Sequence, residues 1–296
     1  MSTVITYGTF GGPEVLEVSD EEVPEPGSRE VVVANRAIGV NPADWKALAG
    51  GFGPQRFPAT LGFEAAGVVT AVGDGVDAPQ VGDEVIWHGT GAQREHSLVR
   101  ATHVVAKPAN LSWAQAAVLP VAGATAFSAL VQVDVGPDDT VLIHGASGGV
   151  GSMAVQIALA LGAKVIGTAS EANHDYLRSL GADPLVYGEG LAAAVREHGG
   201  VTCSVDLAGT ADSVATTVEV LDDLERAVTI AGSPESEAAG IRAKTDQKGA
   251  LAEVVALAEA GRLDVEISAR FPLAEVAEAE ALVKEGHTRG KVVLTI

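Results

Sequence analysis

Residues Thr140–Ser170 read TVLIHGASGGVGSMAVQIALALGAKVIGTAS, and this stretch decides the fold of the chain that contains it. A short β-branched run at Thr140–His144 predicts a strand. Apolar residues then recur at the spacing that lines one face of a helix, and Lys164–Gly167 follows as a second short strand. The order strand, turn, helix and strand predicts a helix that packs on a sheet.

The turn that joins the first strand to the helix is rich in glycine. Ala146-Ser147-Gly148-Gly149-Val150-Gly151 fits the pattern G-x-G-x-x-G, with alanine in the first position. Gly148 allows the backbone to approach a pyrophosphate closely, Gly151 allows the helix to pack against the strand, and the helix N-terminus supplies free N–H groups. Because a strand precedes the pattern and a helix follows it, the stretch predicts a nucleotide-binding unit. The alternative is a glycine-rich turn that binds no ligand.

Composition limits the class of protein. With 296 residues, 47% of them hydrophobic, the chain can bury a large core and is expected to form two domains. The net charge of −20 repels nucleic-acid phosphates and anionic membranes, so we expect neither as a partner. High solubility is the simpler explanation of this acidity.

Targeting signals and cysteine chemistry are also limited by the sequence. No run approaches the roughly 20 apolar residues of a membrane span, and the first ten residues lack a signal-peptide pattern. We therefore expect a cytoplasmic protein. The single cysteine, Cys203, excludes an intramolecular disulfide and a metal site built from cysteines.

The first third of the chain is predicted to be β-structure. Short runs with glycine corners predict a small twisted barrel, and a short helix is expected after Asn41-Pro42. The expected strands include Thr3–Tyr7, Val15–Glu17, Glu30–Val40, Glu84–Trp87, His96–Arg100 and Val104–Lys107.

After Pro108 the pattern becomes helical, with Ser112 as the expected N-cap of the first helix. Helices and strands then alternate, which predicts a parallel sheet with helices on both faces. Beyond Gly261 this alternation stops, and the strands Glu266–Phe271 and Lys291–Ile296 are expected to return to the first domain. The predicted domains are therefore 1–120, 121–262 and a return segment at 263–296.

At this point the sequence resembles a known family. The motifs that carry the resemblance occur in order along nearly the whole chain: Phe10–Leu16, Gly39–Asp44, Gly62–Val69, Val81–Val85, the glycine turn and Gly290–Leu294. Together they resemble the zinc-independent, zeta-crystallin-like quinone oxidoreductases of the medium-chain dehydrogenase/reductase superfamily. The resemblance implies an α/β fold, in which a Rossmann doubly wound parallel sheet accompanies a GroES-like β-barrel catalytic domain, with an NADPH cleft between them.

The resemblance also implies an activity and a cofactor site. The enzyme would transfer a hydride from NADPH to a quinone or to an α,β-unsaturated carbonyl. Asn41 and Thr125 would face the nicotinamide half of NADPH, and Ser170 and His174 would lie at the adenosine ribose. The remaining cofactor residues implied by position are Ser147, Gly148, Gly149, Val150, Gly151, Tyr187, Ala208, Gly232 and Lys291. A core role for Tyr187 and a surface charge for Lys291 are the alternatives.

Zinc independence follows from the residue that precedes Glu64. Phe63 stands where zinc-dependent relatives have a histidine, and carbon cannot bind a metal. His88, His96 and His103 lack the short spacing of a helical zinc pair.

Without a metal, the substrate carbonyl would be polarised by hydrogen-bond donors, with Asn41, Lys46 and the nicotinamide ribose hydroxyl as candidates. Relatives often have a tyrosine after the Asn-Pro segment, whereas this chain has Trp45, so the proton donor stays open. Trp45, Phe52 and His88 are expected to line the substrate pocket. Ordinary anchoring of its loop is an equal alternative for Phe52.

NADPH is predicted over NADH. An NAD-preferring site places a carboxylate at the end of the second strand, about 20 residues beyond the glycines. Here that position is Ser170, which leaves room for a 2′-phosphate, although an inward-turned Glu171 would favour NADH. Relatives usually have lysine where this chain has His174, so phosphate attraction should be weaker and pH-dependent, and Arg178 is a candidate for the missing charge.

The expected oligomeric state and the expected activity both have alternatives. The resemblance implies a homodimer, but the region 233–248, which contributes to dimer contacts in relatives, is abbreviated here. A binding protein that uses NADPH without turnover and a zinc-free alcohol dehydrogenase are the alternatives to the reductase, since function depends on the site and not on the fold.

Overall fold

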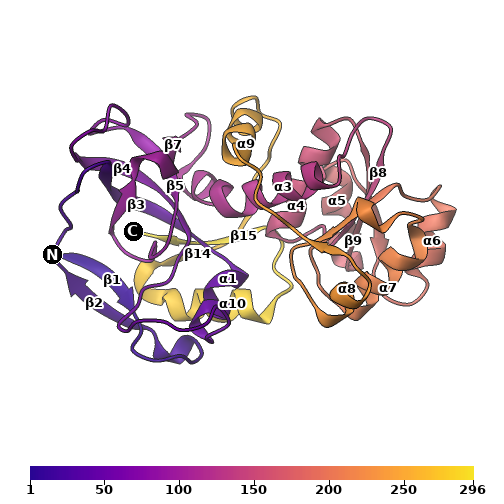
Figure 1. The fold of residues 1–296 in the computed structure, drawn as a ribbon, viewed down its shortest axis with the longest axis horizontal. Coiled ribbons are helices and arrows are strands. Elements are labelled where there is room, and N and C mark those ends of the chain that lie inside the picture. Colours follow the sequence, from indigo (N-terminus) through magenta and orange to yellow (C-terminus); the bar gives the residue numbers. More distant parts are fainter. The chain divides into compact units, whose positions relative to one another are not determined.

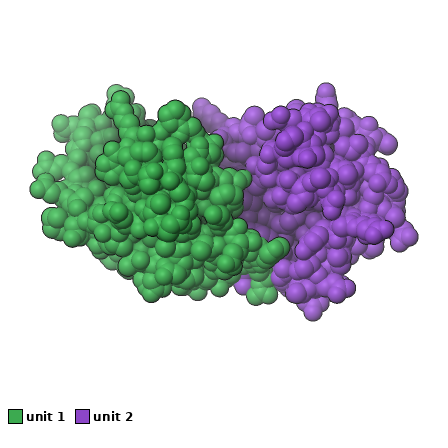
Figure 2. All heavy atoms as spheres, turned by 90° about the horizontal axis from the view of Figure 1, so that it is seen from below, with its two compact units in different colours: residues 1–121, 267–296 green, residues 122–266 purple.

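The computed structural model describes residues 1–296, which form two compact units. Unit 1 contains Met1–Val121 and Ile267–Ile296, and unit 2 contains Ala122–Glu266, as Figures 1 and 2 show. The chain therefore leaves unit 1 one residue after the expected boundary at 120 and returns four residues after the expected boundary at 262.

Unit 1 is built on a seven-stranded sheet whose path runs β14-β15-β3-β4-β5-β7, with β6 paired to β3. All its strand pairs are antiparallel except β14 with β15. The strands of this sheet are β3 (Glu30–Val40), β4 (Glu64–Val72), β5 (Glu84–His88), β6 (His96–Arg100), β7 (Val104–Ala106), β14 (Ile267–Pro272) and β15 (Lys291–Thr295). Because β3 pairs with three other strands, it organises the whole unit.

Smaller elements complete unit 1. The strands β1 (Ser2–Thr6) and β2 (Glu17–Glu21) pair with each other. The helices are α1 (Pro42–Leu48), α2 (Trp113–Ala117) and α10 (Val276–Glu285). Ser112 is the N-cap of α2 and accepts a hydrogen bond from the Gln115 N–H, which confirms the predicted helix start. The strand expected at Val15–Glu17 is wrong, because Pro13–Val15 forms a 3-10 turn that Pro13 begins and the strand starts only at Glu17.

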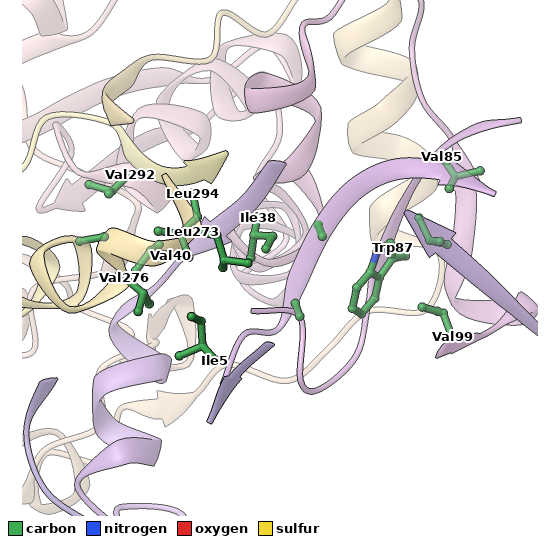
Figure 3. Packing of buried hydrophobic residues seen from close by; sticks show 14 of the residues in the cluster. Ile5, Ile38, Val40, Val85, Trp87, Val99, Leu273, Val276, Val292 and Leu294 are labelled. Atoms are coloured by element: carbon green, nitrogen blue, oxygen red, sulfur yellow. The ribbon is translucent and has the colours of Figure 1, made fainter. Parts of the chain in front are cut away.

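The core of unit 1 lies between the sheet, α10 and the first strand. Figure 3 shows Ile5, Ile38 and Trp87 pointing into this cluster together with Val276 of α10 and Leu294 of β15. The only polar atom of the Trp87 side chain, Nε1, donates a 3.0 Å hydrogen bond to Oδ1 of the buried Asn35. The largest core side chain is therefore buried without an unsatisfied donor.

Unit 2 contains a six-stranded parallel sheet with the order β10-β9-β8-β11-β12-β13. Its strands are β8 (Thr140–His144), β9 (Lys164–Ala169), β10 (Asp183–Val186), β11 (Cys203–Asp206), β12 (Ala227–Thr229) and β13 (Arg242–Ala243). Its helices are α3 (Ala124–Gln132), α4 (Gly149–Ala160), α5 (His174–Ser179), α6 (Leu191–Glu197), α7 (Ala211–Val220), α8 (Pro234–Ala238) and α9 (Ala250–Glu259).

The strand order places helices on both faces of this sheet. From β8 the chain steps outward through β9 to β10, and it then crosses over to β11 and steps outward in the opposite direction. Because such crossovers are right-handed, α4 and α5 cover one face and α6 and α7 cover the other. This arrangement confirms the expected doubly wound Rossmann sheet. No helix of the chain is both long enough and apolar enough to span a bilayer.

Candidate functional site

The sheet of unit 2 reverses its direction of winding at β8, which lies between β9 and β11. In open parallel sheets a crevice forms outside the carboxyl ends of the two strands that flank such a reversal, and ligands bind there. The glycine turn follows β8 directly, and the turn Ala208–Gly209 follows β11. The fold therefore places the glycine turn at the edge of the sheet where ligands of such sheets generally bind.

The glycine turn is held in a tight geometry by its own backbone. A Cβ atom at Gly151 would lie 2.2 Å from the Gly145 carbonyl oxygen and 2.7 Å from Cα of Ala146, so only glycine allows this approach. A Cβ atom at Gly148 would meet only the Gly145 oxygen, at 3.4 Å, which is ordinary contact. Gly151 thus shapes the turn, whereas Gly148 leaves open space in front of it.

Two side chains anchor the turns that follow β8 and β11. Thr168 of β9 accepts a 3.2 Å hydrogen bond from the Gly145 N–H through its hydroxyl, and its carbonyl accepts one from Ala146. The buried Asp206 at the end of β11 accepts 3.0 Å hydrogen bonds from the N–H groups of Ala208 and Gly209. Both turns are fixed before any ligand arrives, while the first N–H groups of the twelve-residue helix α4 have no partner within the helix.

The other cofactor residues expected in unit 2 also follow strand ends. Ser170 follows β9, Tyr187 follows β10, Ala208 lies two residues beyond β11 and Gly232 three residues beyond β12. Because the strands are parallel, these positions share the carboxyl edge of the sheet with the glycine turn. Tyr187 is 54% exposed, so the alternative of a core tyrosine does not hold. Thr125 is the second residue of α3.

The residues expected around the 2′-position of the ribose lie where β9 ends. Ser170 accepts a 3.3 Å hydrogen bond from the Asn173 side chain, and His174 is the first residue of α5. The Nε2 atom of His174 is buried and has no hydrogen-bond partner. Arg178 instead pairs with the exposed Asp175 at 2.8 Å.

Unit 1 contains a cluster of buried polar side chains at one end of its sheet. Asn41 follows the end of β3, Glu64 begins β4 and Lys291 begins β15. Since β4 and β15 both run antiparallel to β3, the start of each lies beside the end of β3. The Asn41 amide donates to Glu64 at 2.9 Å, and Lys291 donates to both Asn41 and Glu64.

Asp44 closes the cluster from the side of α1. It is fully buried and accepts hydrogen bonds from the N–H groups of Asn41, at 2.7 Å, and Gly62, at 2.9 Å. Burial raises the pKa of Asp44 to about 7, against the lowering effect of these hydrogen bonds and of Lys291. The carboxyl group thereby fastens the N-terminus of α1 to the segment that leads into β4.

The remaining residues expected at the catalytic and substrate sites are more exposed. The Lys46 ammonium lies 5.7 Å from the centre of the Trp45 ring, and Phe52 is 63% exposed with its ring edge on Phe63. His88 pairs with Glu64 in the register of β4 and β5, and its ring stacks on that of His103 at 4.6 Å. The structure brings Asn41 together with Lys291, but it gives no contact of Lys46 with either.

Sequence reasoning missed the acidic members of the cluster in unit 1. Glu64 stands within a run of apolar and small residues, and a charge in such a run is the signal that could have identified it. Glu280 and Gln93, which also belong to this buried region, have no comparable sequence signal. No group of three or more histidine, cysteine, aspartate or glutamate side chains comes together in a way that could hold a metal ion.

Two family descriptions match the chain. Residues 27–109 match the alcohol dehydrogenase GroES-like domain, and residues 149–257 match the zinc-binding dehydrogenase domain. A quinone oxidoreductase from Pseudomonas aeruginosa is 34% identical over 99% of this chain and 99% of its own length. One from Salmonella typhimurium is 42% identical, but over 58% of this chain, and the match spans only 54% of that relative.

Solved structures are similar over the whole chain. The quinone oxidoreductase of Escherichia coli, solved in complex with NADPH, has a TM-score of 0.88 and 27% identity, and covers 99% of this chain and 100% of its own. An NAD-dependent alcohol dehydrogenase has a TM-score of 0.91 and 29% identity, with 99% of both chains covered. The two structures share one fold but are named for different reactions.

Proposed function

The chain belongs to the quinone oxidoreductase family of the medium-chain dehydrogenase/reductase superfamily, and on this premise we propose that it is an NADPH-dependent reductase of quinones. Enones and enals are a second acceptor class of the same chemistry. The proposed enzyme needs no zinc. The observation that carries the proposal is the glycine turn at the winding reversal of unit 2, because it is built to accept a pyrophosphate.

The residues of unit 2 fit a dinucleotide. Gly148 leaves open space in front of the turn, and the first N–H groups of α4 can donate to phosphate oxygens. Ser170 at the end of β9 carries no charge that would repel a 2′-phosphate, and the orphaned Nε2 of His174 lies one helical turn beyond it. We assign the pyrophosphate to Ser147–Gly151 and the adenosine end to Ser170, His174 and Tyr187.

The acceptor requires orientation more than acid catalysis. NADPH supplies the hydride when it is bound. Quinones are strong acceptors, so modest polarisation by the Asn41 amide or the Lys46 ammonium suffices once the reacting atoms are aligned. In this proposal Trp45, Phe52 and His88 contact the apolar ring of the acceptor.

Zinc independence is supported by the donors that are present. Phe63 offers no metal-binding atom, and the neighbouring Glu64 already uses both carboxylate oxygens on Asn41, Lys291 and the N–H of Val121. A metal would have to displace an ammonium and two N–H donors from this carboxylate. Hydrogen-bond donors are therefore left to polarise the substrate.

The similarity to an NAD-dependent alcohol dehydrogenase favours one competing function, the oxidation of alcohols. The two activities are separated by following NADPH oxidation at 340 nm with a panel of ortho- and para-quinones and enones, alongside NADP and NAD reduction with simple alcohols. We expect turnover of at least one quinone with NADPH. Steady oxidation of alcohols with no quinone or enone turnover would overturn the proposal, and cofactor binding without any turnover would indicate a binding protein.

A further inference from the structure

The orientation of the Asn41 side chain in unit 1 is dictated by the chemistry of its two neighbours. Lys291 can only donate hydrogen bonds and the Glu64 carboxylate can only accept them. The amide oxygen of Asn41 must therefore face Lys291, and its nitrogen must face Glu64, where the separation is 2.9 Å. An inverted amide would place a donor against the ammonium and an acceptor against the carboxylate, so a single orientation is selected.

Lys291 is fully occupied within this cluster. Its side chain is 5% exposed, and its ammonium donates to the Val40 carbonyl at 3.0 Å, to Asn41 and to Glu64 at 3.2 Å. Three acceptors use all three ammonium hydrogens. Lys291 is thus neither the surface charge considered from the sequence nor left with a hydrogen for a ligand.

Glu64 is held as firmly as Lys291. Its second oxygen accepts a 2.7 Å hydrogen bond from the Val121 N–H, and the whole side chain is buried. A Cβ atom at Gly39 would lie 2.2 Å from Oε1 of Glu64, so the carboxylate occupies the space that glycine leaves on β3. A buried ion pair with every hydrogen bond made keeps its geometry, because any movement would expose an unpaired charge to the core.

We propose that Glu64 is a positioning residue: together with Lys291 it locks the Asn41 amide so that its one remaining N–H is presented to the carbonyl oxygen of the acceptor. This inference rests on the proposed quinone reduction. It selects Asn41 over the exposed Lys46 as the donor that polarises the substrate. Glu64 itself touches neither cofactor nor acceptor and acts only through Asn41.

The test measures whether the effect of Glu64 depends on Asn41. Glu64→Gln should lower kcat for 1,4-naphthoquinone by about tenfold to a hundredfold, with little change in KM for NADPH, because the donor is misplaced and not removed. In an Asn41→Ala background the same change should lower kcat less than about twofold, since coupled residues are not additive. Equal effects in both backgrounds would overturn the proposal. Glu21→Gln, which breaks the surface pair with Arg94, is the matched control and should leave kcat unchanged.

A charge-balanced variant separates positioning from folding. Glu64→Gln alone leaves the Lys291 ammonium unpaired in the core, so stability can fall with activity. The double variant Glu64→Gln with Lys291→Met buries no net charge and should recover most of the melting temperature, yet its kcat should stay low. Recovery of kcat together with stability would show that the pair only supports the fold, and would contradict the proposal.

The amide itself provides a readout that does not need turnover. In ¹⁵N-labelled protein the side-chain NH₂ signals of Asn41, assigned by their loss in Asn41→Ala, should shift and lose exchange protection in Glu64→Gln. Unchanged Asn41 signals would overturn the positioning role whatever the activity. If the wild-type protein reduces no quinone while these signals respond as expected, the proposed reaction fails and the lock on the Asn41 amide stands.

Discussion

The side-chain amide of Gln93 donates a 2.7 Å hydrogen bond to Oε1 of Glu280, and both side chains are fully buried in unit 1. The other carboxyl oxygen of Glu280 and the amide oxygen of Gln93 have no hydrogen-bond partner. Burial, and then the charge of Asp44, raise the pKa of Glu280 to about 9, while Gln93 and Lys291 oppose the rise. At neutral pH this glutamate is therefore a neutral acid in the core.

Glu280 should make the protein less stable as pH rises. The folded state keeps the proton up to about pH 9, whereas the unfolded chain releases it near pH 4.5. Between these pH values the folded protein holds one proton more than the unfolded chain. The free energy of unfolding therefore falls by about 1.4 kcal/mol for each pH unit. Glu280→Gln should flatten this dependence and raise stability at pH 8, as measured by urea unfolding at pH 5.5 and pH 8. Glu278→Gln, on an exposed position of the same helix, is the control and should keep the wild-type slope.

His144 should make the protein less stable as pH falls. It is buried at the end of β8 with Nε2 3.1 Å from the Thr217 hydroxyl, and burial lowers its pKa to about 4 although Asp206 opposes this. The unfolded chain takes up a proton near pH 6.5 and the folded protein only near pH 4, so stability is lost as pH falls through this interval. His144→Gln should weaken that loss in thermal unfolding between pH 7 and pH 4.5. If the stability of His144→Gln falls with pH as steeply as that of the wild type, the prediction is wrong. His198→Gln, on the surface, is the control and should keep the wild-type dependence.

The two glycines of the nucleotide turn should respond differently to alanine. Gly151→Ala forces Cβ against backbone at 2.2 Å, so the turn must move and the protein should lose several degrees in melting temperature. Gly148→Ala meets only an ordinary 3.4 Å contact, so the fold should be kept while NADPH affinity falls, because the added methyl occupies the space in front of the turn. Calorimetric titration with NADPH and melting curves distinguish the two. Unaltered NADPH binding by Gly148→Ala would argue against a pyrophosphate at this turn.

Cofactor preference should depend on the charge of the residue at position 174. We expect kcat/KM for NADPH to exceed that for NADH at both pH 6 and pH 8. In His174→Lys, whose ammonium adds a positive charge near the expected 2′-phosphate, the ratio of the two values should be larger. Equal or better use of NADH at both pH values would refute the NADPH assignment.

The zinc content of the purified protein tests zinc independence directly. Protein purified without added metal should contain far less than about one equivalent of zinc per chain, and a chelator should not change its rate with NADPH and quinone. The reason is that Phe63 supplies no ligand and Glu64 is already engaged by three donors. Stoichiometric zinc whose removal abolishes activity would overturn zinc independence.

The alternation of strands and helices in unit 2 was predictable because it is encoded locally. The strand Thr140–His144 matches its predicted bounds residue for residue. Hydrophobic periodicity and glycine-rich turns report on neighbours in sequence, and most consecutive strands of this sheet, though not β10 and β11, are also neighbours in space. The glycine motif was therefore recognisable, as a turn between a strand and a helix, without knowledge of the tertiary structure.

The contacts within the polar cluster of unit 1 were decided by the tertiary structure. Lys291 and Glu64 are separated by 227 residues and meet because β15 and β4 both pair with β3. In the run Ala-Glu-Ala-Glu-Ala, Glu278 is exposed and Glu280 is buried, and nothing in the sequence separates them. Which face of α10 packs against the sheet determines which carboxyl group loses water. Burial then sets the ionisation of that group, and long-range strand pairing sets the orientation of the Asn41 amide.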